Sequence, residues 1–402
     1  MIEYKEIEEA YEILQPVVKK TYLKRSKTFS EMTDTNLYLK MENLQLTGSF
    51  KIRGAYNKIY HLSEKEKQNG VVCSSAGNHA QGVAHAATLL DVKSTVFMPI
   101  FAPPTKILAT KTYGAKVILK GETYDDAYVN ALEYRDKHNL SFVHAFNDDD
   151  VIAGQGTIGI EIIQDLPDVD VILVPIGGGG LISGISIAVK HLKPDVKIIG
   201  VEAEGAKAML QSIQAGSIIP MKNLSTIADG IAVKTPGEKT FRIIKDLVDD
   251  IITVSDKEIS QAMYHLLQRA KIVTEPSGAV TLAAALSHKK DFEEKNMACI
   301  ISGGNANLSL LTQIIEQGMI SNHLMGKMII TVPDKPKIFK DIITILSNMN
   351  VNIQSISLDR SSTNVPVGSV NIYLSILIVG EELINGIYEE LKQINLPCEI
   401  CC

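Results

Sequence analysis

Residues 49–55 are Ser49-Phe50-Lys51-Ile52-Arg53-Gly54-Ala55, and they follow a polar, loop-like segment, Asn43-Leu44-Gln45-Leu46-Thr47-Gly48. Gly48 and Ser49 can open a helix, with the serine as N-cap, which would place Lys51 in the first helical turn. A half-buried lysine beside helix-end N–H groups is pushed toward the neutral amine, the form that attacks a carbonyl group. A lone lysine is more often a solvated side chain on a helix face, so the rest of the chain must decide.

Composition describes an ordinary globular protein. The chain has 402 residues, a net charge of -6 and 45% hydrophobic residues, enough for two or three domains. Lysines and arginines are scattered, which argues against nucleic acid as a partner. No apolar run has the length of a membrane span, and the N-terminus does not resemble a signal peptide.

The five cysteines predict a reduced environment. Cys73 and Cys299 lie in apolar runs and are expected to be buried thiols, and the cysteines near the C-terminus lack a second set of zinc ligands. We therefore expect a cytoplasmic protein without a structural metal.

Strands and helices alternate along the first three quarters of the chain. Apolar strand-like runs are separated by helical segments of ten or more residues, which predicts parallel sheets in an α/β arrangement. The predicted strands are 37–42, 70–74, 94–98, 116–119, 169–176, 198–202, 251–254 and 297–302. The predicted helices are 3–18, 83–90, 105–113, 123–138, one opened by Ala153-Gly154-Gln155-Gly156-Thr157, and 182–191.

Composition changes near residues 321–327, which we interpret as a linker. Residues 1–320 are expected to form a catalytic region, in which a small subdomain, roughly 47–150, is inserted into a larger one. Residues 328–402 predict the order strand, helix, strand, strand, helix and a final short strand. That order is typical of a ferredoxin-like α+β module.

Three loops follow predicted strands. They are an asparagine loop (Ser75-Ala76-Gly77-Asn78-His79-Ala80-Gln81-Gly82), a tetraglycine turn (Gly177 to Gly180) and a serine-glycine loop (Ser302-Gly303-Gly304-Asn305). Ligands in open α/β sheets bind at the carboxyl ends of strands. The glycine turn lacks the lysine of a P-loop and the spacing of a dinucleotide fingerprint. It suits a single phosphate held by backbone N–H groups, although close helix–strand packing would also require glycine.

These groups suit the different edges of pyridoxal 5'-phosphate. Lys51 would bond the aldehyde carbon, and the glycine turn would hold the phosphate. The Asn78 amide would meet the ring hydroxyl, and the Ser302 hydroxyl would meet the ring nitrogen. A serine does not protonate that nitrogen as an aspartate would, which favours elimination over chemistry that needs a full ring carbanion.

The lysine motif and the three loops together resemble those of fold-type-II pyridoxal-phosphate enzymes. The chain resembles threonine dehydratases (threonine ammonia-lyases) of the medium-length form with one C-terminal ACT domain. The resemblance implies two open, twisted, three-layer subdomains of the tryptophan-synthase-β-like type. It also implies a carbon–nitrogen lyase that deaminates L-threonine to 2-oxobutanoate and ammonia, with L-serine to pyruvate as a lesser activity.

The resemblance also implies roles for individual residues. Lys51 would carry the cofactor and remove the α-proton of the substrate. The other implied cofactor contacts are Phe50, Asn78, Gly177, Gly178, Gly179, Gly180, Leu181, Gly230 and Ser302, and the implied substrate contacts are Ser75, Gly77 and Asn78. His79 could act as an acid, but packing at the start of the following helix is the preferred interpretation.

Departures from related enzymes leave alternatives. Ala76 stands where the related serine racemases carry a serine, so racemisation should be weak. Glu202 lies where those racemases bind a metal, but Ala208 supplies no carboxylate there. We therefore expect no divalent metal, and a monovalent ion at Glu202 stays open. A serine dehydratase or racemase is the main alternative function, and a catalytically silent amino-acid sensor is a second one.

The ACT-like region implies self-association and a small ligand. Asn350 and Asn352 lie in the part that would face an effector such as isoleucine, valine or AMP. A dimerisation module without an effector is the alternative. A homo-oligomer, either a dimer or a tetramer, is expected, and both isoleucine biosynthesis and threonine catabolism stay open as the metabolic role.

Overall fold

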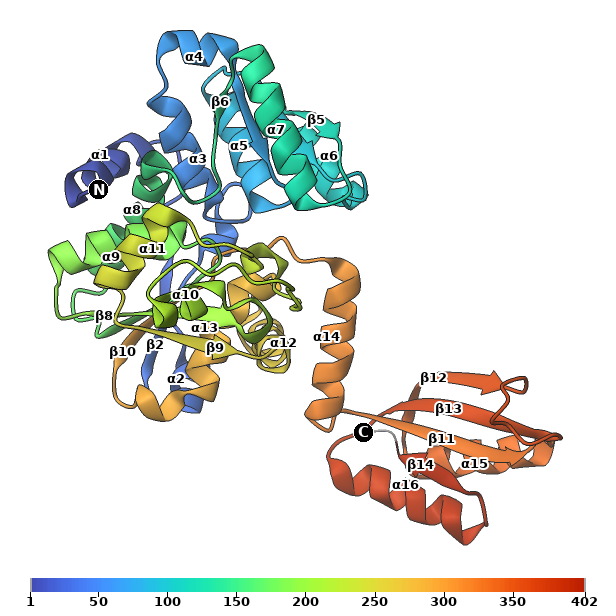
Figure 1. Cartoon of the computed structure of the whole chain (residues 1–402). Helices are drawn as coiled ribbons and strands as arrows, with labels where there is room; N and C mark the ends of the chain where they lie inside the picture. Colours follow the sequence, from blue (N-terminus) through green and yellow to red (C-terminus); the bar gives the residue numbers. More distant parts are fainter. Residues whose placement is uncertain (1, 401–402) are drawn as a thin grey trace. The chain divides into compact units, whose positions relative to one another are not determined.

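The computed structural model describes residues 2–400 and divides the chain into two compact units, Met1–Asn307 and Leu308–Cys402 (Figure 1). The first unit contains two open sheets, and the second contains one. Within residues 2–400, no helix combines the length and the apolar composition needed to cross a bilayer.

The larger sheet of the first unit has six strands in the order β1-β2-β10-β7-β8-β9. β1 pairs antiparallel with β2, and the other neighbours pair in parallel. The strands are β1 (Leu23–Arg25), β2 (Asn36–Lys40), β7 (Val171–Pro175), β8 (Lys197–Ala203), β9 (Asp250–Val254) and β10 (Asn296–Ile300). All five residues of β7 are buried, as expected for a central strand of a parallel sheet covered on both faces.

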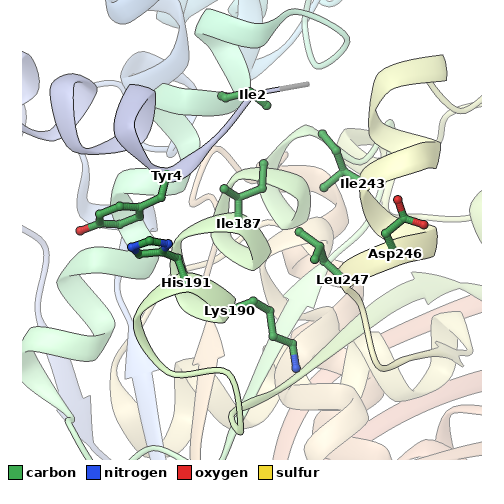
Figure 2. A pocket seen from close by; sticks show the side chains of 8 residues that line it. All are labelled: Ile2, Tyr4, Ile187, Lys190, His191, Ile243, Asp246 and Leu247. Carbon is green, nitrogen blue, oxygen red and sulfur yellow. The ribbon is translucent and has the colours of Figure 1, made fainter.

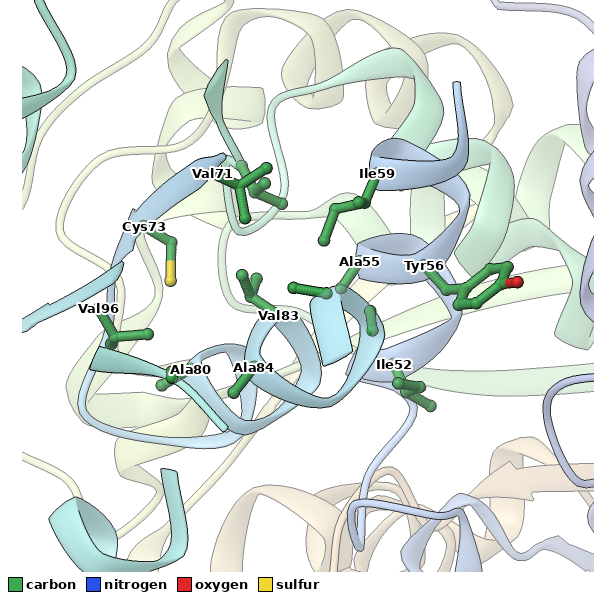
Figure 3. Packing of buried hydrophobic residues seen from close by; sticks show 14 of the residues in the cluster. Ile52, Ala55, Tyr56, Ile59, Val71, Cys73, Ala80, Val83, Ala84 and Val96 are labelled. Carbon is green, nitrogen blue, oxygen red and sulfur yellow. The ribbon is translucent and has the colours of Figure 1, made fainter. Parts of the chain in front are cut away.

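The smaller sheet has four parallel strands in the order β5-β4-β3-β6. They are β3 (Val71–Ser74), β4 (Ser94–Met98), β5 (Lys116–Leu119) and β6 (Ser141–Phe142). One hydrophobic cluster joins β3 and β4 to two helices and includes Ile52, Val83 and Cys73 (Figure 3). Cys73 is buried, as predicted. Burial raises the pKa of its thiol to about 12, which makes the thiol unreactive.

Helices cover both sheets of the first unit. They are α1 (Tyr4–Leu14), α2 (Lys27–Thr33), α3 (Lys51–Tyr60), α4 (Glu64–Asn69), α5 (Asn78–Leu89), α6 (Pro104–Thr112), α7 (Tyr124–His138), α8 (Asp149–Asp165), α9 (Gly180–Leu192), α10 (Ala208–Ala215), α11 (Glu238–Leu247), α12 (Asp256–His265) and α13 (Pro276–Ser287).

Two predicted helix starts are wrong. Helix α8 begins at Asp149, because the Asp148 side chain accepts hydrogen bonds from two backbone N–H groups of its first turn. The glycines predicted to open this helix lie inside it. A Cβ on Gly156 would stand 2.7 Å from the carbonyl oxygen of Gly184 in α9, so these glycines allow close packing of the two helices. Helix α5 begins at Asn78, five residues before the predicted start.

A buried group of four charges joins α3 to β2 and α8 in the first unit. Arg53 of α3 donates to Glu42 at 2.8 Å and to Glu161 of α8 at 2.7 Å, and Lys40 of β2 lies 2.5 Å from Glu161. Thr21 donates to Glu42 as well. Burial alone would raise the pKa of the Glu42 carboxyl, but Arg53 lowers it, so Glu42 is ionised. We call Lys40, Glu42, Arg53 and Glu161 the buried ion cluster.

The second unit contains a four-stranded antiparallel sheet in the order β12-β13-β11-β14. Its elements are α14 (Leu308–Ser321), β11 (Met325–Pro333), α15 (Pro336–Asn348), β12 (Asn352–Asp359), β13 (Ser369–Leu377), α16 (Glu381–Gln393) and β14 (Cys398–Ile400). From β11 onward the order and pairing are those of the predicted ferredoxin-like module, which confirms the fold class. The boundary between the two compact units falls just before α14, so α14 belongs to the second unit. The assignment of 321–327 as a linker, and the wider domain limits, stay predictions.

Replacing Arg53 with methionine should destabilise the first unit by about 3–5 kcal/mol, because two buried carboxylates would lose their shared cation. The loss is measured as the free energy of unfolding in urea, followed by circular dichroism.

Lys20→Met is the matched control, since Lys20 pairs with Asp165 of the same helix α8 but is half exposed. It should change the free energy by less than about 1 kcal/mol. Equal effects of the two substitutions would contradict a special role for the buried ion cluster.

Candidate active site

Lys51 lies in the first turn of α3, as predicted, and is its first residue, but Ser49 is not the cap. The N-cap is Phe50, because the backbone of Ser49 is held in an antiparallel bridge with Gly303. Lys51 Nζ donates to the carbonyl oxygen of Ala145 at 3.0 Å and lies 5.0 Å from the centre of the Phe50 ring. Burial lowers the pKa of the Lys51 amine to about 8, even though the nearby Glu275 carboxyl opposes this shift.

The tetraglycine turn connects β7 to α9 and has no space for side chains. Gly179 has φ +93°, a conformation that favours glycine. A Cβ on Gly178 would stand 2.2 Å from the Phe146 ring, and one on Gly180 would stand 2.9 Å from the Phe146 Cα. Ala145 and Phe146 are adjacent, so one short segment contacts both Lys51 and the turn. The turn, followed by Leu181 at the start of α9, leaves helix N-terminal N–H groups available for an anion.

The asparagine loop lies between β3 and α5. The backbone N–H of Gly77 donates to Ser75 Oγ at 3.2 Å, and a Cβ on Gly77 would meet nothing within 4 Å. Asn78, the first residue of α5, donates from Nδ2 to Glu275 Oε1 at 2.6 Å and accepts at Oδ1 from Asn305 Nδ2 at 2.7 Å. The loop therefore offers open space beside a helix N-terminus.

Ser302 lies two residues after the end of β10, and its carbonyl oxygen accepts a hydrogen bond from the backbone N–H of Phe50 at 3.2 Å. Ser302 Oγ donates to the carbonyl oxygen of Ser277 at 3.3 Å. Ser277 Oγ is buried without a partner in the described chain and would lie 2.6 Å from a Cβ on Gly230. The serine-glycine loop is thus placed beside the lysine and beside Gly230.

The two nearby histidines are neutral. His79 Nε2 bonds to the carbonyl oxygen of Val143 at 2.8 Å, and burial lowers the pKa of His79 to about 3. His144 accepts at Nδ1 from the backbone N–H groups of Phe146 and Asn147, and burial lowers its pKa to about 4. Because a carbonyl only accepts, His79 carries its proton on Nε2 and orients the loop, which favours the packing interpretation.

Glu202 is engaged by backbone groups. Its two carboxylate oxygens accept from the N–H groups of Met209 at 3.0 Å and Leu210 at 2.8 Å, in the first turn of α10. Burial raises the pKa of the Glu202 carboxyl to about 7 despite these bonds. Capping of α10 explains why a carboxylate is buried here without invoking an ion. Among the described residues, no group of three or more His, Cys, Asp or Glu side chains is placed to hold a metal.

A separate hollow of about 350 Å³ lies between α1, α9 and α11 (Figure 2). Its wall includes the Tyr4 ring, stacked on the His191 ring at a centroid distance of 4.2 Å. None of the predicted site residues lines this hollow.

The predicted cofactor residues are linked to one another through contacts within the first unit. An amine of lowered pKa, a turn without side chains at a helix N-terminus, an amide and a serine hydroxyl fit an aldehyde, a phosphate and a ring with polar edges. The turn without side chains at the N-terminus of α9 and the unpartnered hydroxyl of Ser277 are the features of this structure that suit pyridoxal phosphate.

Comparison with known proteins agrees with this geometry. Residues 14–303 match the family described as pyridoxal-phosphate dependent enzyme. The chain belongs to this family. Residues 328–395 match the ACT domain, so this pyridoxal-phosphate dependent enzyme carries an ACT domain in its second unit.

Several known proteins resemble this enzyme over much of its length. An L-threonine ammonia-lyase of Thermotoga maritima is 47% identical over 387 residues, which cover 96% of each chain. The solved structure of threonine deaminase isoform 2 from Solanum lycopersicum is 37% identical with a TM-score of 0.74, covering 79% of this chain and 96% of that one. Maize serine racemase is 36% identical with a TM-score of 0.75, covering 80% of this chain and 99% of that one.

Sequence reasoning missed two contributors to the site. Glu275 contacts Asn78, and the Ala145–Phe146 segment contacts Lys51 and the glycine turn. Glu275 precedes Pro276, which begins α13, and an acidic residue before a helix-opening proline suggests only an N-terminal position. Nothing in the pattern around Ala145 or Phe146 indicates a role.

The rate at which the cofactor-free enzyme takes up pyridoxal phosphate should rise with pH through a midpoint of about 8. Only the unprotonated Lys51 amine can react with an aldehyde, and its lowered pKa makes this form abundant at mildly alkaline pH. The rate is followed by the absorbance of the bound chromophore. A midpoint near the ordinary lysine value of about 10.4 would contradict the effect of burial on Lys51.

Proposed function

We propose that this pyridoxal-phosphate dependent enzyme deaminates L-threonine to 2-oxobutanoate and ammonia, and converts L-serine to pyruvate and ammonia as a lesser activity. The support is the linked set of cofactor residues around Lys51, together with the 47% identity to a protein named L-threonine ammonia-lyase over 96% of both chains.

Pyridoxal phosphate, when bound, supplies an electron sink for the pair released when the α C–H bond of the substrate breaks. Lys51 would bond the aldehyde until the amine of the substrate displaces it. The freed Nζ would then accept the α-proton, and the β-hydroxyl group would leave with a proton as water. The amine is suited to this role because burial sets its pKa near 8, within reach of neutral conditions. Phe50 and Gly230 would bound the two faces of the ring.

The asparagine loop would hold the substrate carboxylate. Ser75 Oγ, the open space above Gly77 and the N-terminus of α5 provide a hydroxyl, room and backbone N–H groups with a favourable dipole for an anion. His79 is not available to protonate the departing hydroxide, because its Nε2–H is bonded to Val143 and its pKa is about 3.

Replacing Lys51 with alanine should abolish the covalent chromophore and lower deamination of threonine by at least about 10²–10⁴-fold, because the substitution removes the base. The measurements are the absorbance spectrum and a keto-acid assay with threonine and with serine. A variant that keeps more than about a tenth of the activity would contradict the assignment of Lys51 as the base. Absence of keto acid from the wild-type enzyme with any hydroxy amino acid would favour the sensor alternative.

Racemisation of serine should be about 10²-fold slower than its deamination, because Ala76 offers no second proton-transfer group. The measurement is the chirality of recovered serine beside the yield of pyruvate. Ala76→Ser is the matched variant and should raise racemisation relative to deamination. Equal rates in the wild-type enzyme would favour the racemase alternative.

For the ACT domain we propose binding of a small effector, with isoleucine, valine and AMP as the compounds to test. Asn350 has φ +54° and lies two residues after the end of α15, so its replacement would strain the turn. Asn352 begins β12 and is the better test. We also propose that the enzyme is a homo-oligomer and acts in the cytoplasm. The thiols of Cys73, Cys299 and Cys398 are free, which is compatible with a reducing compartment.

If an effector acts through this site, Asn352→Ala should reduce the change in the half-saturating threonine concentration that the effector causes, and leave activity without it unchanged. Activity that none of the three compounds alters, across substrate concentrations, would favour a dimerisation module.

A further inference from the structure

A chain of hydrogen bonds fixes the direction of the Asn78 side-chain amide. It begins at the carbonyl oxygen of Thr47, which accepts from Asn305 Nδ2 at 2.9 Å. The same nitrogen donates to Asn78 Oδ1 at 2.7 Å. On its other side, Asn78 Nδ2 donates to Glu275 Oε1 at 2.6 Å.

The direction of this chain follows from chemistry alone. A backbone carbonyl only accepts, so the atom of Asn305 that faces Thr47 must be its nitrogen. That nitrogen only donates, so the atom of Asn78 that faces it must be the oxygen. The amide nitrogen of Asn78 is then directed toward Glu275, whose carboxylate only accepts when it is ionised. Each residue is therefore oriented by the one before it.

Glycines allow these contacts to form. A Cβ on Gly303 would stand 2.3 Å from Glu275 Oε1 and 3.1 Å from Asn78 Nδ2, and a Cβ on Gly48 would stand 2.5 Å from Asn305 Oδ1. The backbone N–H of Glu275 also donates to the carbonyl oxygen of Gly303 at 3.1 Å. The chain of hydrogen bonds thus connects the segment 43–48 before Lys51, the asparagine loop and the serine-glycine loop.

The charges around Glu275 have opposing effects. Burial raises the pKa of the Glu275 carboxyl to about 7, and Asp229 adds to the rise. The Asn78 amide, Lys106 and Lys51 oppose it. A carboxyl in this setting is retained at a cost in desolvation, and its Oε1 is bonded to the Asn78 amide.

We propose that Asn305 and Glu275 are positioning residues that make Asn78 present an N–H donor, and not its carbonyl oxygen, to the ring oxygen of pyridoxal phosphate. Asn78 Nδ2 has two hydrogens. One is used by Glu275, and the second is available to the cofactor. This inference rests on the proposed placement of the cofactor ring against Asn78. A donor at that point stabilises the deprotonated ring oxygen, so it strengthens binding and keeps the ring oxygen unprotonated to lower pH.

Asn305→Asp tests the direction of the amide. An aspartate accepts where Asn305 donates, so the Asn78 amide would turn its nitrogen toward residue 305 and its oxygen toward Glu275 and the cofactor. We expect the dissociation constant of pyridoxal phosphate to rise at least about tenfold. We also expect the pH at which the bound chromophore changes its absorbance to rise by about one unit.

Glu275→Gln and Glu275→Leu test the acceptor. Glutamine can still accept from Asn78 through its carbonyl oxygen, so the affinity for pyridoxal phosphate should stay within about threefold of wild type. Leucine leaves the amide without its acceptor and should weaken binding by about tenfold. Recovery with glutamine separates hydrogen bonding from the charge of Glu275.

Asn69→Asp is the control, because it also replaces an amide that donates to a backbone carbonyl, that of Asn139 at 3.0 Å, on an exposed surface. It should leave the affinity and the spectrum unchanged. If circular dichroism shows that Asn305→Asp does not fold, Asn305→Ala is the second variant. It removes the donor to Asn78 Oδ1 without adding charge, and it should weaken the binding of pyridoxal phosphate by about threefold or more.

Wild-type affinity and an unchanged chromophore pH dependence in the folded Asn305 variant would overturn the inference. Equal loss in Glu275→Gln and Glu275→Leu would overturn it as well, since the carboxylate charge alone would then account for the effect. Neither outcome touches the proposed function, which fails separately if the wild-type enzyme forms no keto acid from threonine or if Lys51→Ala stays active.

Discussion

The first unit depends on four charges that are removed from water together. Arg53 is two residues after Lys51 and bonds both Glu42 and Glu161, while Lys40 bonds Glu161 from the neighbouring strand. Buried ion pairs add little net stability compared with apolar residues of the same shape, but each member requires its partners. The cluster therefore constrains how α3 packs against α8, and Lys51 lies in the first turn of α3.

Several contacts that position the site are made to backbone groups. The carbonyl oxygens of Ala145 and Val143 accept from Lys51 and His79, and the N–H of Phe50 donates to Ser302. Because of such contacts, the geometry of the site depends on the fold of the whole first unit. The lowered pKa of the Lys51 amine and the neutral state of His79 have the same origin, because burial disfavours the charged form of each group.

Much of the fold could be predicted from sequence because it follows from the spacing of apolar residues and from the positions of glycine and proline. The strands 94–98 and 116–119 have the predicted bounds, since short apolar runs between glycine and proline signals leave few alternatives. The start of α8 differs from the prediction because Gly154 and Gly156 lie inside the helix and do not open it, while Asp148 is the N-cap. The buried ion cluster and the contact of Glu275 with Asn78 could not be predicted, since they join residues 11 to 197 positions apart and sequence spacing carries no information on such pairs.

The glycines just before α3, in the tetraglycine turn and in the serine-glycine loop have a consequence for how such enzymes are recognised. Gly48, Gly178 and Gly303 are each opposed by an atom of the protein itself, belonging to Asn305, Phe146 and Glu275. The signature that makes the chain identifiable is thus a record of how its loops pack. A descendant that exchanged Lys51 for another residue would keep the same glycines under the same steric selection. Such a descendant would still be recognised as a member of the family after its activity was lost. The residue at position 51 would distinguish it from an active enzyme.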